Sequence, residues 1–302
     1  MNAAAVHLNT PRAPLSDRLL GPLLIAPAVL ILSAVIVYPL VATAWLSLFA
    51  IDTRTMSGEW VGLANFAAML GPDGRFLGAL GVTLVWTGGT IVLQLALGVG
   101  MALLLNQPLW FRSFARGLAL FPYLVSTVVA VLVWRWLFND FFGLINQALI
   151  GLGVIARPID WLGAMPNAMA STIVVGAWKF FPFVVIAVLA RLQTIPEPLY
   201  EAARLDGAGA WGRFRDVTLP QIADVLGIVV LLRAVWDFKE FDLIFLLTGG
   251  GPVDATRTLP LVVYQEAFGL NRMGFASAHA LGMMAVMTLF FIAYRILTRG
   301  RA

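Results

Sequence analysis

The sequence has no cysteine, only two histidines and few charged side chains, and each shortage argues against a class of function. Only 12% of its 302 residues are charged and 60% are hydrophobic, which is too little charge for the surface of a soluble domain. Without cysteine there is no disulfide or thiolate chemistry, and His7 and His279 alone make a zinc site improbable. We therefore expect no metal or redox enzyme, and lipid as the solvent for most of the chain.

Sequence patterns for nucleotide hydrolysis and hydrolytic catalysis are also missing. The chain has no G-x-x-x-x-G-K-[ST] loop to cradle the phosphates of ATP, and neither H-E-x-x-H nor G-x-S-x-G occurs. A net charge of +4 would suit nucleic acid, but basic residues beside membrane spans give the same bias. We expect no nucleic-acid partner, no bound metal and no catalytic residue.

Six apolar runs are long enough to cross a hydrocarbon core of about 30 Å. They lie near 19–49, 77–105, 117–138, 168–190, 222–247 and 276–297. A backbone in lipid must satisfy its own hydrogen bonds, and the ten-residue alternating segments of a membrane barrel are absent from the sequence. The sequence therefore predicts an all-α polytopic membrane protein with six transmembrane helices. Pro39, Pro122 and Pro182 lie in or near these runs, where proline bends a helix or is tolerated as a packed kink.

The basic residues orient these spans. Eleven arginines, among them Arg12, Arg18, Arg299 and Arg301, lie in the two termini and the 106–116 and 191–221 loops, against five in the opposite loops. The positive-inside rule then places both termini in the cytoplasm of a bacterial inner membrane. The chain divides into a tail (1–18), a first span with its external loop (19–76), a core of five spans (77–297) that includes the cytoplasmic loop 191–221, and a second tail (298–302).

The 191–221 loop is polar in an otherwise apolar chain. Pro196 and Pro198 can open a helix, and residues 199–205 are rich in helix formers. Gly207 then breaks this helix, 210–217 supports a second short helix, and Pro220 marks the passage into the fifth span. Two interpretations stay open on these grounds: an amphipathic segment on anionic lipid, or a protein-docking knob.

The stretch EAARLDGAGAWGRFRDVTLP at 201–220 resembles the cytoplasmic coupling loop of membrane subunits of binding-protein-dependent ABC importers. The matching positions are Glu201, Ala202, Ala203, Asp206, Gly207, Ala208, Leu219 and Pro220. The stretches GLANF, WRWLFNDFFGLINQAL and FDLIFLLTGGGP resemble the carbohydrate-uptake branch, so the likeness covers nearly the whole chain. The chain is similar to the larger membrane subunit of the maltose importer family, without its extra N-terminal spans and large external insertion.

This resemblance implies a type I ABC importer permease fold and a pore-forming, non-enzymatic subunit. A separate cytoplasmic ATPase dimer would bind ATP and Mg, and this chain would bind no cofactor. A second homologous permease would complete the pore, and an external solute-binding protein would deliver a carbohydrate to the 50–76, 139–167 and 248–275 loops. Glu201 would pair with a basic group of the ATPase, Ala202 and Ala203 would allow close approach, and Gly207 would supply the bend.

Charges inside the predicted spans are the physical clue to a substrate path. Each costs about 2.5–3.5 kcal/mol at the bilayer centre, so each needs a partner or water. On a continuous helix, Arg233, Asp237 and Glu240 would share one face and Lys239 and Asp242 another. The spacing favours internally compensated pairs. The alternative is a sugar site formed by Trp178, Lys179, Asp237 and Glu240, in which Lys179 would also suit an anionic group such as that of a glycerol phosphate or another anionic sugar derivative.

A proton- or ion-coupled secondary transporter is the other function that intramembrane carboxylates allow. It would use Asp237 and Glu240 as proton carriers. That function gives the 201–220 loop no role, and such transporters usually show an internal repeat that is not evident in this sequence. An ATP-driven importer is therefore the favoured prediction, and the sequence does not specify its sugar.

Overall fold

The computed structural model describes residues 15–55, 57–108 and 110–298, so His7, Arg12, Arg299 and Arg301 lie outside the described residues. The helices are α1 (Leu15–Leu32), α2 (Tyr38–Leu46), α3 (Ala64–Leu70), α4 (Phe76–Leu105), α5 (Arg112–Leu124), α6 (Thr127–Leu137), α7 (Leu144–Gly151), α8 (Asn167–Leu192), α9 (Glu197–Leu205), α10 (Ala210–Arg213), α11 (Leu219–Phe238), α12 (Asp242–Leu247), α13 (Leu259–Tyr264) and α14 (Met273–Thr298). Short π-helical segments occur at η1 (Ser33–Val37), η3 (Phe214–Thr218) and η4 (Gln265–Gly269), and a 3-10 turn at η2 (Pro72–Gly74). The strands β1 (Phe49–Asp52) and β2 (Ser57–Trp60) form one antiparallel hairpin.

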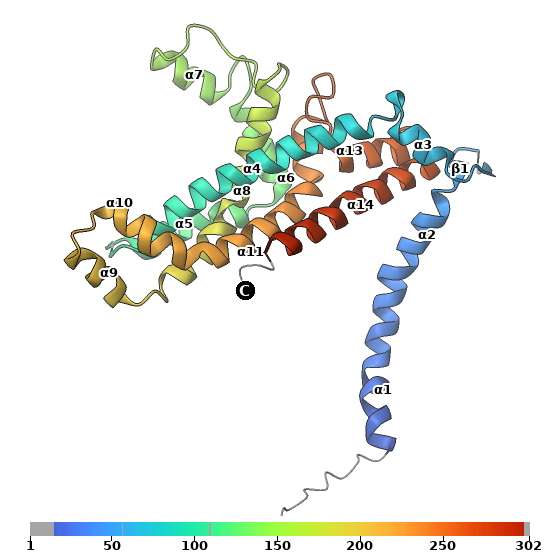
Figure 1. The fold of residues 1–302 in the computed structure, drawn as a ribbon. Coiled ribbons are helices and arrows are strands. Elements are labelled where there is room, and N and C mark those ends of the chain that lie inside the picture. Colours follow the sequence, from blue (N-terminus) through green and yellow to red (C-terminus); the bar gives the residue numbers. More distant parts are fainter. Residues whose placement is uncertain (1–14, 56, 109, 299–302) are drawn as a thin grey trace, which may run out of the picture.

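Helices long and apolar enough to cross a membrane dominate the described chain. Five are continuous: Leu20–Leu46, Phe76–Leu105, Asn167–Leu192, Ala210–Phe238 and Met273–Ile296. A sixth candidate is the bent pair α5 and α6. The predicted all-α polytopic architecture is therefore confirmed, and Figure 1 shows the long helices α4, α8, α11 and α14 running side by side.

The third predicted span, 117–138, is not one continuous helix. α5 and α6 meet at 96° across Val125 and Ser126, whose backbones are extended with ψ of 137° and 141°. Pro122, one turn earlier, removes a backbone donor from α5 and weakens the helix there. The prediction of a single helix over 117–138 is therefore wrong, although the two halves together have the length and composition of one span.

The fifth predicted span, 222–247, is wrong at both ends. The helix begins at Ala210, passes through η3 into α11 and stops at Phe238, and α12 is a separate short helix. Pro220 lies in the first turn of α11, where its missing N–H costs little, so it marks the passage into the span without interrupting the helix. The second helix of the 191–221 loop and the span that follows it therefore form one continuous helix.

The first span stands away from the other helices. In Figure 1 it runs from α1 through η1 to α2 and joins the rest of the chain only near β1 and α14. The most apolar window of this span is 0% buried, and Leu24 and Tyr38 are 72% and 73% exposed. Because apolar surface of this extent is not stable in water, the span requires lipid or another protein around it.

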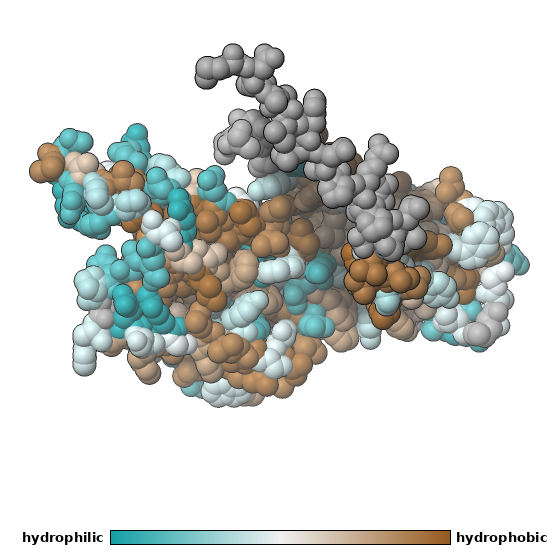
Figure 2. Space-filling model, turned by 90° about the horizontal axis from the view of Figure 1, so that it is seen from below, coloured by the Kyte–Doolittle hydropathy of each residue, from teal (hydrophilic) through white to brown (hydrophobic). Residues whose placement is uncertain are grey.

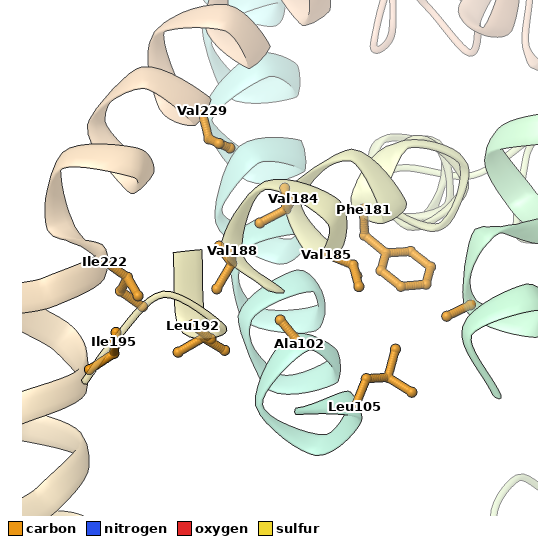
Figure 3. Close-up of a cluster of buried hydrophobic side chains, with 11 residues drawn as sticks. Ala102, Leu105, Phe181, Val184, Val185, Val188, Leu192, Ile195, Ile222 and Val229 are labelled. Carbon is orange, nitrogen blue, oxygen red and sulfur yellow. The ribbon is translucent and has the colours of Figure 1, made fainter. Parts of the chain in front are cut away.

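A hydrophobic core joins α4, α8 and α11 (Figure 3). Val184, Val188 and Leu192 of α8 pack with Ala102 of α4 and Ile222 of α11, and each is at most 4% exposed. Figure 2 shows hydrophobic side chains over much of the visible surface and hydrophilic ones gathered at the end that holds α9 and α10 in Figure 1. The core therefore ties the base of the polar loop to the membrane helices.

Two glycines allow α4 and α8 to approach closely. A Cβ atom on Gly98 of α4 would lie 2.4 Å from Cβ of Val184, and one on Gly176 of α8 would lie 2.2 Å from the Trp86 ring. Real Cβ atoms do not tolerate such distances, so glycine is required at both positions by the neighbouring helix.

The contact at Gly98 is testable with alanine. Gly98→Ala should destabilise the protein by about 1–3 kcal/mol relative to Gly88→Ala, because the added methyl group forces α4 and α8 apart. Gly88, on the same helix, has open space around it and gains the same helix propensity, so it is the matched control. Thermal unfolding of the purified variants in detergent measures the difference, and equal unfolding temperatures would contradict the packing described here.

Candidate functional site

The 191–221 loop folds into two short helices joined by a left-handed turn. α9 ends at Leu205, and Gly207 follows it in the turn with φ +79°. The Gly207 N–H donates to Arg204 O at 3.1 Å, and the Ala208 N–H donates to Ala203 O at 2.9 Å. These two bonds form a Schellman motif, which satisfies the last carbonyls of α9 and reverses the chain. A residue with a Cβ resists this φ, which explains the glycine in the sequence.

Side-chain bonds fix the base of this loop to the membrane helices. Arg191, at the end of α8, donates from Nε to Gln221 O at 2.8 Å and from Nη2 to Gln221 Oε1 at 2.9 Å. Nearer the tip, the Tyr200 hydroxyl lies 3.0 Å from Oγ1 of Thr218, which links α9 to η3. The loop is therefore held by two sets of bonds, one between α8 and α11 at its base and one between α9 and η3 nearer its tip. A displacement of the tip would be passed to both α8 and α11.

The tip of the loop exposes a mixed surface of charged, small and apolar side chains. Glu201, Ala202 and Asp206 are exposed, and among the described residues Glu201 has no ion-pair partner. Leu205 and Trp211 are 90% and 72% exposed. A free carboxylate beside alanine and unburied apolar groups is suited to a protein cleft.

The residues around this tip are partly paired and partly exposed. Glu197 and Arg204 form an ion pair of 2.5 Å within α9. Ala203 is half-buried, whereas Leu219 and Pro220 are exposed in the first turn of α11. The seven predicted coupling residues are therefore divided among three places: Glu201, Ala202 and Ala203 on α9, Asp206 and Gly207 in the turn after it, and Leu219 and Pro220 in the first turn of α11.

At the far end of α11, a buried polar cluster joins this helix to α4. Arg233 and Asp237 form a salt bridge, and their side chains are 3% and 1% exposed. Gln94 of α4 bridges the pair, accepting from Arg233 Nε at 2.8 Å and donating to Asp237 Oδ2 at 3.2 Å. The indole N–H of Trp86 donates to the backbone oxygen of Asp237 at 3.0 Å. The predicted pairing of Arg233 with Asp237 is confirmed.

Lys179 is satisfied by backbone carbonyls rather than by a carboxylate. Its amine donates to Pro122 O at 3.0 Å, Tyr123 O at 3.1 Å and Val125 O at 2.5 Å. An ammonium has three protons, so this set uses all of them. The three oxygens belong to the last turn of α5 and to Val125 at the 96° bend, where helical partners end. Lys179 therefore caps the broken end of the third span.

The remaining predicted charge pairs do not form among the described residues. α11 ends at Phe238, so the helical spacing that would place Glu240 beside Arg233, and Lys239 beside Asp242, does not apply. Oε1 of Glu240 instead accepts the Leu243 N–H at 3.1 Å, which satisfies an orphan donor of α12. The predictions of a shared face for Glu240 and of a pair between Lys239 and Asp242 are wrong because the chain leaves the helix between them.

Trp178 lies on α8 next to Lys179. Its ring is half-buried and meets Trp134 of α6 edge to face at 5.5 Å. Of the four residues predicted to bind substrate, Lys179 and Asp237 hold partners within the chain, Glu240 binds one backbone donor, and Trp178 contacts another aromatic ring. Their role in substrate binding stays a prediction.

The end of the molecule opposite the loop carries the β-hairpin. Asp52 pairs through its backbone with Arg272, whose side chain forms an ion pair of 2.5 Å with Glu266. This contact brings two of the predicted external loops, 50–76 and 248–275, together. The third, 139–167, forms a separate lobe around α7, where Asn146 bonds Ile159 and the Trp161 indole at 2.9–3.1 Å (Figure 1). In this loop, burial raises the pKa of the Asp140 carboxyl, and the Asp160 carboxylate raises it further.

Sequence reasoning missed four residues of this arrangement. Gln94 and Trp86 are uncharged, so a search for intramembrane charges does not select them, although a glutamine in a long apolar run is itself a signal. Leu205 and Trp211 carry no charge and no motif position that would select them, and the structure shows that both are exposed.

Comparison with known proteins gives consistent matches. Residues 94–302 match the family described as binding-protein-dependent transport system inner membrane component. The chain is 35% identical over 287 residues to a probable ABC transporter permease protein of Brucella suis, covering 95% of this chain and 99% of that protein. It is 34% identical over 282 residues to the trehalose/maltose transport system permease protein MalF of Thermococcus litoralis, covering 93% and 94%. A chain of a bacterial alginate ABC transporter, solved in complex with an alginate pentasaccharide-bound periplasmic protein, shares the fold with a TM-score of 0.79 at 20% identity, covering 94% and 95%.

The cap at the bend can be tested through the two lysines of the chain. Lys179→Met should lower the free energy of unfolding by about 1–3 kcal/mol, because it leaves buried carbonyl oxygens without a partner. Lys239 is exposed, so Lys239→Met should change stability by no more than about 0.5 kcal/mol. Thermal unfolding in detergent compares the two variants, and an equal effect would show that the carbonyl contacts of Lys179 do not hold the bend.

Proposed function

Since the chain belongs to the family of binding-protein-dependent transport system inner membrane components, we propose that it is the pore-forming permease subunit of an ATP-driven carbohydrate importer. It is a multi-pass membrane protein with the type I importer permease fold. The carbohydrate substrate is supported by its relatives, one of which is a trehalose/maltose transport permease. The 191–221 loop transmits the motion of a partner ATPase to the membrane helices.

A continuous helix connects the loop with the buried cluster, and this connection supports the proposal most strongly. Ala210–Phe238 is one helix, which begins in the exposed loop and ends one residue after Asp237. At that end, Gln94 and Trp86 hold it to α4. When the tip of the loop is displaced, the start of α11 moves with it, while the other end of α11 stays bonded to α4. Closure of the ATPase therefore changes the angle between α11 and the helices that pack against it.

The roles of the loop residues follow from their exposure. Glu201 presents an unpaired carboxylate to a basic group of the ATPase, and Ala202 and Ala203 let the two surfaces approach closely. Leu205 and Trp211 bury their apolar surface in the same cleft. Asp206 and Gly207 form the turn that ends α9, and Leu219 and Pro220 begin α11, which carries the loop into the membrane.

Three protein partners are proposed. A cytoplasmic ATPase dimer binds ATP and Mg, and an external solute-binding protein, of the kind seen with the alginate transporter, docks at the hairpin end. A second, homologous permease completes the pore, and the exposed first span, Leu20–Leu46, is the surface of this chain that most needs such a neighbour. Membrane lipid covers the remaining apolar surface.

The proposed location is a bacterial cytoplasmic membrane with both termini and the 191–221 loop in the cytoplasm. The arginines of this loop support the orientation: Arg191 lies in the last turn of α8, and Arg204, Arg213 and Arg215 lie in α9, α10 and η3, which follow it in the loop. The hairpin and the α7 lobe are then external, where a solute-binding protein arrives.

Trp178, Lys179, Asp237 and Glu240 remain the residues proposed for the substrate site, and their surroundings separate them into two kinds. Lys179 and Asp237 are engaged by carbonyls and by Arg233, so they act by holding the shape of the site. Trp178 can offer a ring face for stacking, and Glu240 has a carboxylate oxygen beyond the one that accepts Leu243 N–H. Because the Lys179 protons are occupied, an anionic glycerol phosphate is a less suitable substrate than a neutral sugar.

The docking role predicts a specific effect of Glu201→Lys. Reversing this charge should weaken binding of the ATPase about tenfold to a hundredfold, the value of a charge-assisted hydrogen bond, and should reduce transport-stimulated ATP hydrolysis equally. Glu59→Lys, an exposed charge reversal on β2 at the opposite end of the spans, is the control for binding and should leave the affinity for the ATPase unchanged. Co-purification and ATPase assays measure the effect. If the Glu201→Lys complex keeps full affinity and activity, the loop does not dock through this residue, and if it instead loses affinity for anionic vesicles, the loop is a membrane-surface segment.

A further inference from the structure

Arg116, on α5, is partly buried, and two of its three guanidinium nitrogens are buried without a partner among the described residues. Among the described residues, neither Nε nor Nη2 of Arg116 has a hydrogen-bond acceptor, although both atoms are shielded from solvent. Arginine stays charged in proteins, so it cannot escape this environment by losing its proton. Buried donors without an acceptor are destabilising, so these two N–H groups are suited to an anionic acceptor from outside the described residues.

The Arg116 side chain lines a cavity whose other walls are apolar except for Gln193. The cavity has a volume of about 210 Å³ and lies between α5, the end of α4 and the last turns of α8. Leu105 and Val185 form its floor and are each 1% exposed, whereas Ile186 at its edge is 51% exposed. The site therefore offers one cation and an apolar surface that continues to the outside of the helix bundle.

The depth of this cavity matches a membrane interface. Leu105 is the last residue of the α4 span, and the residues that follow it, Asn106 and Gln107, line a second cavity with the 191–221 loop. Nearby on the chain, Trp110 and Phe114 are 95% and 74% exposed, as expected for aromatic residues at the boundary between headgroups and hydrocarbon. An anion bound to Arg116 would sit at headgroup level.

We propose that this cavity is a binding site for an anionic phospholipid, whose phosphate accepts hydrogen bonds from Nε and Nη2 of Arg116 and whose acyl chain lies along Ile186 and Leu189. The charge of the guanidinium selects the head group, and the apolar wall selects the tail. A free phosphate would leave the apolar wall exposed to water. The site lies outside the loop tip and the buried cluster, so it adds a lipid requirement to the proposed transport function and does not depend on the sugar.

The test measures lipid retained by the assembled transporter. The complex containing the full chain is exchanged into detergent with equal amounts of phosphatidylglycerol and phosphatidylcholine of the same acyl chains, and bound lipids are counted by native mass spectrometry. The wild type should keep phosphatidylglycerol in preference. Arg116→Gln should reduce this retention at least about tenfold, because it removes the charge behind both hydrogen bonds to the phosphate, and Arg116→Lys should keep part of it.

Arg112→Gln is the matched control, because Arg112 is exposed one turn earlier on the same helix. It should change retention little, since an exposed charge is screened by salt. Equal retention by the wild type and Arg116→Gln, or an equal loss in both glutamine variants, would overturn the proposal, as would a carboxylate of another subunit seen on Arg116. If Arg116→Gln does not assemble, the wild type alone decides: no preference for phosphatidylglycerol over phosphatidylcholine would refute the site.

Discussion

The structure depends on one constraint: a charge or a backbone carbonyl within lipid has no water and must find its partner inside the protein. The buried salt bridge of Arg233 and Asp237 satisfies this constraint with the help of Gln94 from α4. Lys179 satisfies it by binding the carbonyls that the bend between α5 and α6 leaves free. In both cases the need for a partner joins two helices that are distant in sequence, so polar groups decide how the apolar helices are arranged.

These polar anchors and the exposed loop form one mechanical unit. Arg191 and Gln221 fix the base of the loop, and a continuous helix carries its motion from Ala210 to the cluster at Asp237. The hydrophobic core between α4, α8 and α11 keeps these helices in contact, but apolar contacts can slide and are less directional than the bonds of the cluster. A partner that moves the loop therefore displaces helices whose far ends are held in defined positions.

The sequence predicted the parts of this architecture that are local. Apolar run length located the spans, spacing of four residues paired Arg233 with Asp237, and Gly207 marked the turn because only glycine adopts its φ readily. The resemblance of the chain to importer permeases, based on the motif at 201–220, is borne out by the family match.

The features that the sequence did not predict arise from contacts between distant residues. Pro122 marks a weak point within the third span, but the bend after Val125 is stabilised by Lys179, 54 residues away, so no window around this span contains the contact that holds it. The end of α11 at Phe238 goes with Glu240 binding the first turn of α12, an interaction that apolar content alone does not reveal. The exposure of the first span likewise depends on the packing of the whole chain.

The central claim is that a separate cytoplasmic ATPase drives transport by this chain through the 191–221 loop. Uptake of labelled sugar into vesicles containing the chain, its second permease and its solute-binding protein, with ATP on the loop side, tests it most directly. The account predicts accumulation only when the ATPase subunit is also present, and no loss of accumulation when a proton uncoupler collapses the pH gradient at constant ATP. Accumulation without the ATPase, or its collapse with the proton gradient, would contradict the account.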